Sequence, residues 1–153
     1  MKKNPALLFL LFLFLFSCKA EKPVIIDGID YKTAIIGKWE AISLGKVMQQ
    51  FNYALPCRFE FKKNGDYYYM YTRLGVRKER TGSYELNLQQ RPVEITFEQK
   101  KPLNAVMYGI IRFVNAETIH TIFYYKNVMT RVYEFKETEI QIFKKVTDFT
   151  PQG

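Results

Sequence analysis

The side chains of this sequence best suited to covalent or proton-transfer chemistry are two cysteines, Cys18 and Cys57, and one histidine, His120. A thiolate attacks electrophiles and binds metal ions, and imidazole exchanges protons near neutral pH. No cluster of cysteine, histidine or carboxylate residues surrounds Cys57 at the spacing of a metal site. His120 lies in a short stretch with a strand pattern, which is typical of a hydrogen-bonded structural histidine. These residues therefore do not predict a catalytic or metal centre.

The carboxylate residues do not predict a catalytic centre either. Glu94 and Glu98 fall on one face of a predicted strand, but at roughly 3.3 Å per residue they stand about 13 Å apart. That separation is too large for the carboxylate pair of a glycosidase. The sequence shows no serine–histidine–aspartate arrangement and no phosphate-binding loop. We therefore expect a protein that is not an enzyme and that needs no cofactor.

Cys18 directly follows a segment typical of an export signal. Lys2 and Lys3 give it a positive start, and residues 6–16 form an unbroken apolar run of Leu, Phe and Ala. Such a run has the length of a signal-peptide core and is shorter than the about 20 apolar residues that cross a bilayer. The chain turns polar straight after Cys18. This pattern predicts export from the cytoplasm.

The sequence Leu15-Phe16-Ser17-Cys18 resembles the lipobox of bacterial lipoproteins, with Leu at −3, a small residue at −1 and Cys at +1. The resemblance implies cleavage before Cys18, a diacylglycerol on its sulfur and acylation of its new amine. Several acyl chains on one residue would anchor the protein firmly in a membrane. The expected location is the bacterial cell envelope, at the outer membrane, facing the periplasm or the outside. A plain secretory signal and an uncleaved anchor are the alternatives.

The chain after the signal has the length of one domain. We expect a signal peptide at 1–17, the acylated cysteine and a tether at 18–29, a barrel domain at 30–148 and a tail at 149–153. Loss of the signal would leave 21 basic against 15 acidic residues. The basic residues are scattered as pairs, so nucleic acid is not an expected partner. Cys57 would then have no partner cysteine, which favours a buried inert thiol over a reactive one.

The folded part reads as a series of short strands. Asn64-Gly65 between two alternating stretches predicts a two-residue hairpin, and Gly82 within a strand pattern predicts a bulge. Asp30 is expected to cap one helical turn over 30–36, and 45–56 to be irregular. Short strands joined by tight turns predict an all-β antiparallel up-and-down barrel of about eight strands; an open sandwich is the alternative. The expected strands are 39–44, 58–61, 66–72, 79–88, 92–98, 106–114, 118–125, 130–135 and 139–146.

Three of these stretches resemble a known family. Gly37-Lys38-Trp39, opening the first strand, resembles the Gly-x-Trp signature of lipocalins, and Phe59 to Tyr67 and Thr81 to Leu86 resemble later strands of small bacterial lipocalin-like lipoproteins. The likeness covers about residues 35–146. It implies an eight-stranded barrel with a cup-shaped interior, and a role in binding small apolar molecules.

Two functions follow from a barrel with this composition. In the first, aromatic side chains line a pocket for a small hydrophobic ligand; if they fill the core instead, no pocket remains. The candidates are Trp39, Tyr67, Tyr69, Tyr71, Tyr84, Phe97, Tyr108, Phe113, Phe123, Tyr125 and Tyr133. In the second, the barrel is filled, and its exposed aromatic and basic residues bind an envelope protein or a polysaccharide. Candidates for that surface are Tyr68, Lys78, Arg80, Arg112, Tyr124 and Arg131.

Overall fold

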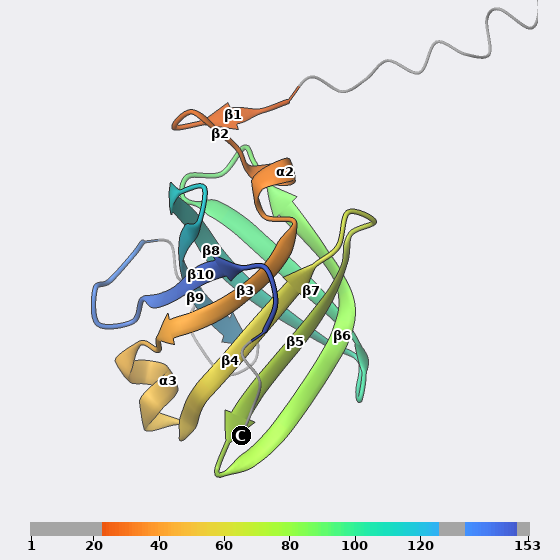
Figure 1. The fold of residues 1–153 in the computed structure, drawn as a ribbon, viewed down its shortest axis with the longest axis vertical. Coiled ribbons are helices and arrows are strands. Elements are labelled where there is room, and N and C mark those ends of the chain that lie inside the picture. The colour runs from red at the N-terminus through yellow and green to blue at the C-terminus, as the bar shows by residue number, and fades with distance from the viewer. Residues whose placement is uncertain (1–22, 126–133, 150–153) are drawn as a thin grey trace, which may run out of the picture.

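The computed structural model describes residues 23–125 and 134–149. Eight antiparallel strands close into a barrel, and a short two-stranded ribbon, β1 (Ile25–Ile26) and β2 (Ile29–Asp30), precedes them (Figure 1). This confirms the expected all-β barrel. The barrel strands are β3 (Gly37–Ser43), β4 (Tyr53–Phe61), β5 (Asp66–Arg73), β6 (Val76–Asn87), β7 (Val93–Lys101), β8 (Ala105–Asn115), β9 (Thr118–Tyr125) and β10 (Gln141–Val146).

The strands follow one another around the barrel, each paired with its neighbour in sequence from β3 to β9. β10 closes the barrel because it pairs with β9 on one side and with β3 on the other. A final hairpin of 130–135 with 139–146 was expected. That expectation is wrong where it can be checked, because Glu134 and Phe135 are not in a strand and β10 pairs with β9. Residues 130–133 lie outside the described residues.

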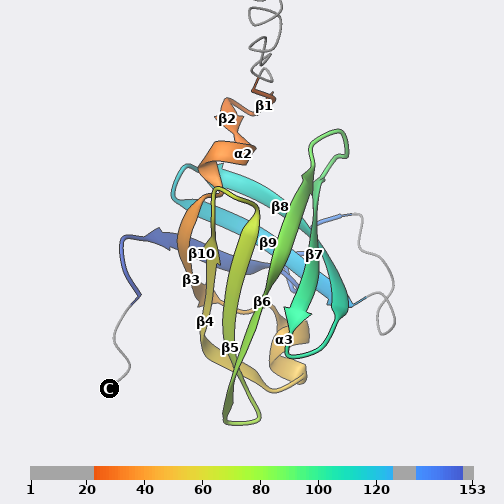
Figure 2. The same cartoon turned by 90° about the vertical axis from the view of Figure 1, so that its right-hand side faces the viewer.

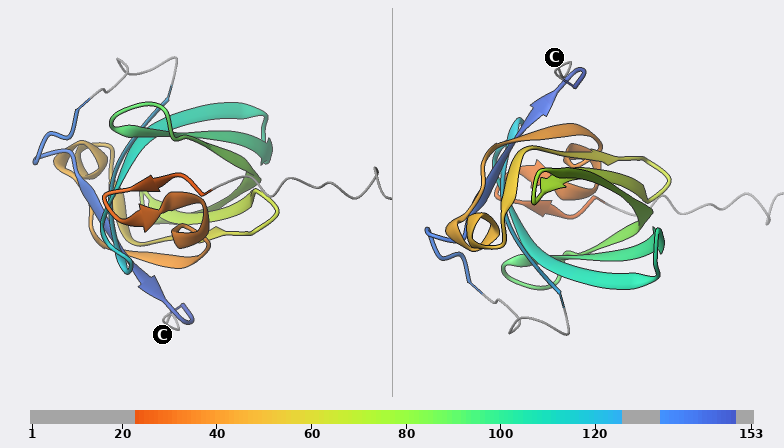
Figure 3. Two further views of the ribbon diagram at one scale, coloured as in Figure 1. Left: turned by 90° about the horizontal axis from the view of Figure 1, so that it is seen from above. Right: turned by 90° about the horizontal axis from the view of Figure 1, so that it is seen from below.

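The helix α2 (Tyr31–Ala34) closes one end of the barrel, where the ribbon also lies (Figures 2 and 3). Asp30 caps this turn as expected, since its carboxylate accepts from the backbone N–H of Lys32. Trp39 is fully buried, and its indole N–H donates to the carbonyl of Ile35 at 2.7 Å. Tyr31 packs edge-on against Phe113, with ring centroids 4.7 Å apart. The α2 end is therefore sealed by buried side chains.

The other end carries α3 (Lys46–Gln50), where the sequence had suggested irregular chain. None of its five residues is buried, although Met48 packs partly against the core. A helix this short gives little periodic signal, which explains why sequence patterning missed it. Of the residues that the structure describes, those at the α3 end therefore cover the barrel much more lightly than those at the α2 end. Among the described residues, no helix is long and apolar enough to cross a membrane.

Two turns refine the expected hairpins. The turn between β4 and β5 is longer than the two residues expected: Gly65 donates to the carbonyl of Lys62, and its φ of 85° gives the left-handed position of a bulged hairpin. The turn between β5 and β6 is the tighter one, with Leu74 and Gly75 both at positive φ. The register shift between Thr81 and Gly82 confirms the expected bulge.

Candidate functional site

The barrel interior is built from the alternate residues of each strand, because successive side chains point to opposite faces. Most of the predicted pocket residues belong to the hydrophobic core cluster in this interior. Tyr84 is partly buried and packs against the cluster. The other inward candidates are buried within the cluster: Trp39, Tyr67, Tyr69, Tyr71, Phe97, Phe113 and Phe123.

These rings fill the middle of the barrel. Phe59 lies at their centre and contacts six other rings, with centroid distances from 4.0 Å to Tyr69 up to 6.4 Å to Tyr67. Offset and edge-on arrangements at these distances are those of a packed aromatic core. The middle of the barrel is therefore a filled core, and any small ligand would have to bind nearer an end.

Tyr108 does not belong to the interior. It pairs with Tyr124 across β8 and β9, and the two rings stack at 5.9 Å on the outer face. The alternation of β8 explains the difference, since its neighbour Met107 takes the inward position. Tyr133 and the side chain of Tyr125 lie outside the described residues.

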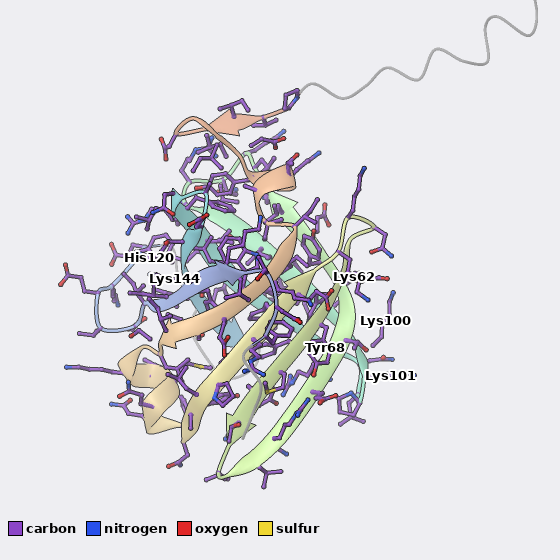
Figure 4. The ribbon with its side chains drawn as sticks, viewed as in Figure 1. Lys62, Tyr68, Lys100, Lys101, His120 and Lys144 are labelled. Atoms are coloured by element: carbon purple, nitrogen blue, oxygen red, sulfur yellow. The ribbon has the colours of Figure 1, made fainter. Side chains whose placement is uncertain are left out.

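The second set of candidates, expected on the outer surface, divides in a similar way. Tyr68 and Arg112 do face outward, and Figure 4 shows Tyr68 on the same side of the barrel as Lys62, Lys100 and Lys101. Tyr124 faces outward but is only 2% exposed, so the prediction that it contributes to an exposed binding surface is wrong. Arg131 lies outside the described residues.

Lys78 and Arg80, expected on the outside, take inward positions on β6, because they pair with the inward-facing Tyr71 and Tyr69. The Arg80 guanidinium donates from Nε and Nη2 to the Tyr71 hydroxyl at 2.9 and 2.7 Å. Its Nη1 donates to Gln99 Oε1 at 2.7 Å, and Gln99 Nε2 donates in turn to the carbonyl of Leu103. The guanidinium is thereby fixed in position at the α3 end.

Aromatic rings continue this cluster toward the end of the barrel. Tyr53 stacks on Tyr71 at 5.2 Å, and the guanidinium carbon of Arg73 lies 5.4 Å from the centre of the Tyr53 ring. Burial raises the pKa of Tyr67 to about 12, and the positive charge of Arg80 partly opposes this rise. The phenol of Tyr67 therefore remains neutral at physiological pH.

Two buried polar atoms in the barrel interior have no hydrogen-bond partner within the described chain: Gln141 Oε1 and Thr121 Oγ1. The two residues face each other across β10 and β9, and each is 1% exposed. Both share the inward face, since Gln141 lies two residues from Phe143 and Thr121 two from Phe123. Neither residue was among the predicted site residues; a polar residue at an inward position of an alternating strand was the available signal.

Of the three residues considered first for chemistry, Cys57 and His120 lie in β4 and β9, and Cys18 lies outside the described residues. Burial raises the pKa of Cys57 to about 12, although its hydrogen bond to the Tyr69 hydroxyl acts in the opposite direction. Its thiol is therefore protonated and buried. Burial and the nearby charge of Arg112 lower the pKa of His120. Its Nδ1 lies 3.2 Å from an Arg112 nitrogen, and because the guanidinium is always a donor, the imidazole accepts.

The described residues contain no group of three or more His, Cys, Asp or Glu side chains arranged to hold a metal ion. They line several surface hollows, of about 320, 470 and 490 Å³. The smallest is bordered by Tyr68, Thr81 and Lys100 on the outer face of β5 to β7, and the other two lie near the loops of the α2 end. These hollows are open to solvent, and the smallest also borders Tyr67 of the buried aromatic cluster.

Comparison with known proteins adds no relative: no family model, no curated protein and no solved structure matches this chain. The closed eight-stranded antiparallel barrel is compatible with the lipocalin-like architecture that the sequence resembles.

Proposed function

We propose that this protein is a lipid-anchored, non-enzymatic module of the bacterial cell envelope whose lipocalin-like barrel binds a small ligand. The proposal of a lipid anchor is based on the sequence Leu15-Phe16-Ser17-Cys18. The proposal of a ligand is based on the interior of the barrel near its α3 end. Because aromatic rings fill the middle of the barrel, we propose the ligand at that end, where α3 buries none of its own residues.

The observation that supports ligand binding is a pair of buried oxygens without a hydrogen-bond partner in the described chain, Gln141 Oε1 and Thr121 Oγ1. Buried polar atoms in folded proteins are almost always hydrogen-bonded, and leaving one unpaired costs about 1–3 kcal/mol. An amide oxygen only accepts, so its partner must be a donor. A ligand with a hydroxyl or N–H group would satisfy Gln141 Oε1 and recover this cost.

The double variant Gln141→Met, Thr121→Val tests the proposal, because it removes both oxygens at nearly constant volume. We expect native mass spectrometry of the wild-type protein to show a co-purifying small molecule, and the double variant to lose most of it. We also expect the ligand-free variant to unfold at the same or up to about 2 kcal/mol higher free energy, since the two oxygens that it removes form no hydrogen bond within the described chain.

Gln99→Met is the matched control for stability. Its amide is satisfied on both sides, by Arg80 and by the carbonyl of Leu103, so its loss should destabilise the protein by about 1–3 kcal/mol. The proposal fails if the wild-type protein carries no ligand and the double variant is destabilised as much as this control.

A filled barrel that binds an envelope protein or a polysaccharide is the second candidate. The packing of six rings around Phe59 favours it, and Tyr108 and Arg112 both face outward on β8. A wild-type mass without ligand, together with binding to envelope polysaccharide that Tyr108→Ala and Arg112→Ala weaken, would support this candidate over the first.

Cys18→Ser tests the anchor. In a Gram-negative host supplied with labelled palmitate, we expect the wild-type chain to carry the label and to sediment with membranes, and the variant to lose the label completely because serine offers no thioether. Cys57→Ser is the matched control and should keep the label, since Cys57 is buried in the barrel. A label that persists in Cys18→Ser would refute the lipoprotein assignment.

A further inference from the structure

The smallest surface hollow, of about 320 Å³, lies on the outer side of the barrel where β6 has its bulge. At the register shift in β6, Lys100 of β7 has no residue opposite it. Bulges of this kind re-aim side chains and are common beside functional sites. The side chains that line the hollow and bear on its chemistry are Glu60, Lys62, Asp66, Tyr68, Thr81 and Lys100.

Tyr68 gives this hollow an aromatic side. Its ring is half-buried, and its neighbours in β5, Tyr67 and Tyr69, point into the barrel. The Tyr68 hydroxyl interacts with Arg77 and Glu79, which pair with each other at 2.6 Å. Burial raises the pKa of Tyr68, so its phenol is neutral at physiological pH. A ring whose hydroxyl is held in this way loses little freedom when a ligand packs against it.

Two lysines add positive charge to the hollow. Lys62 and Lys100 are exposed, and neither ammonium group forms an ion pair with an acid in the part of the chain that the structure describes. Lys101 continues the positive edge, and Figure 4 shows the three lysines on the side of the barrel that carries Tyr68. Ammonium groups in such a position can donate charge-assisted hydrogen bonds to an anionic group of a ligand.

The hollow also offers hydrogen-bond acceptors. Glu60 and Asp66 are half-buried, and the Asp66 carboxylate accepts from the side-chain amide of Asn64 at 2.9 Å. Carboxylate oxygens accept hydrogen bonds from hydroxyl groups, and the Thr81 hydroxyl can both donate and accept. Because like charges repel, an anionic group of a ligand would lie toward the lysines and its hydroxyl groups toward the carboxylates.

We propose that this hollow binds an anionic sugar unit of an envelope polysaccharide, a pyranose ring that carries a carboxylate or a phosphate. The weakly positive C–H groups of such a ring pack against the negative face of an aromatic ring, which Tyr68 supplies. A volume of about 320 Å³ is at the lower end of the range for small-molecule sites and suits one or two sugar rings. The inference rests on the proposed envelope location for the source of the sugar, but it does not depend on a ligand inside the barrel.

The test is a titration of the full chain in a non-ionic detergent with methyl glucuronide, glucose 6-phosphate, methyl glucoside and acetate. The glucuronide and the glucoside differ only in the carboxylate, so this pair isolates the anionic group. We expect both anionic sugars to bind at least about fivefold more tightly than the glucoside, because hydrogen bonds to charged groups are the stronger ones. Acetate should bind more weakly than either, since it has no ring. The tighter of the two anionic sugars identifies a uronic acid or a phosphorylated sugar as the source.

Tyr68→Ala should lose the binding of all three sugars, and Tyr68→Phe should keep it because the ring remains. The double variant Lys62→Gln, Lys100→Gln should bring both anionic sugars to the affinity of the glucoside. Both lysines are exposed, so this variant should fold even if Tyr68→Ala does not. Since the chain has a formal net charge of +8, the matched control is Lys46→Gln, Lys136→Gln. It removes the same charge away from the hollow and should leave every affinity unchanged.

Equal affinity for the glucuronide and the glucoside would overturn the inference, as would binding of none of the probes. An equal loss in the control and in Lys62→Gln, Lys100→Gln would overturn it by showing non-specific attraction. Binding that Tyr108→Ala and Arg112→Ala weaken and Tyr68→Ala does not would also overturn it, and would assign the sugar to the outer face of β8. The native mass spectrum of the wild-type protein tests the ligand inside the barrel separately from all of these outcomes.

Discussion

Replacing Phe59 with alanine is expected to lower the free energy of unfolding by about 4 kcal/mol. Removing a buried ring costs its transfer energy and leaves a cavity, and Phe59 lies among six rings that can collapse only a little because each is held by other neighbours. Chemical denaturation followed by the fluorescence of Trp39 and by circular dichroism would measure the change.

Phe51→Ala is the matched control, since Phe51 is 43% exposed at the end of α3 and its loss should cost less than about 1 kcal/mol. Phe59→Leu should lie between the two variants, because it leaves a smaller cavity, and it serves if Phe59→Ala does not fold. A loss below about 1 kcal/mol for Phe59→Ala would contradict the filled core, and would reopen the middle of the barrel as a binding cavity.

Gly82→Ala is the second substitution with a large expected effect. A Cβ atom at this position would lie only 1.9 Å from the backbone carbonyl oxygen of Glu98. Side chains cannot give way here, because the obstacle is the backbone of the neighbouring strand. We expect the β6–β7 pairing at the bulge to be distorted, at a cost of about 3 kcal/mol in the free energy of unfolding.

Gly75→Ala separates crowding from backbone strain. Gly75 has a φ of 73°, but a Cβ atom there would meet no atom within 4 Å, so its cost should be that of the left-handed conformation alone, about 1 kcal/mol. The φ of Gly82 is not in the left-handed region, so the constraint at Gly82 is the lack of space for a Cβ atom. A larger loss for Gly75→Ala than for Gly82→Ala would refute the close approach of β6 and β7.

The architecture was largely predictable because it is set by local patterns. Alternating stretches such as 93–97 showed which residues face inward, and Val93, Ile95 and Phe97 are all buried as their spacing requires. Gly82 predicted a bulge, and Asp30 a helix cap. The predictions that failed concerned segments without a strong hydrophobic periodicity. The helix α3 is only five residues long, and the strand expected over 130–135 is absent at Glu134 and Phe135.

The candidate site was less predictable, because it depends on register between strands. Sequence alone placed Lys78 and Arg80 on the surface, as long basic side chains usually are. The pairing of β5 with β6 instead places them beside Tyr71 and Tyr69, on the inner face. The polar pair Gln141 and Thr121 arises in the same way, because β10 meets β9 only when the barrel closes.

The sequence by itself determined the strand pattern, the turns, the buried tryptophan and the motif at Cys18, because each depends on residues close together in the chain. Only the tertiary structure decided that aromatic rings fill the middle of the barrel and that Lys78 and Arg80 take positions on the inner face of its wall. Those features depend on which strands become neighbours and in which register, and a shift of one residue would exchange the two faces.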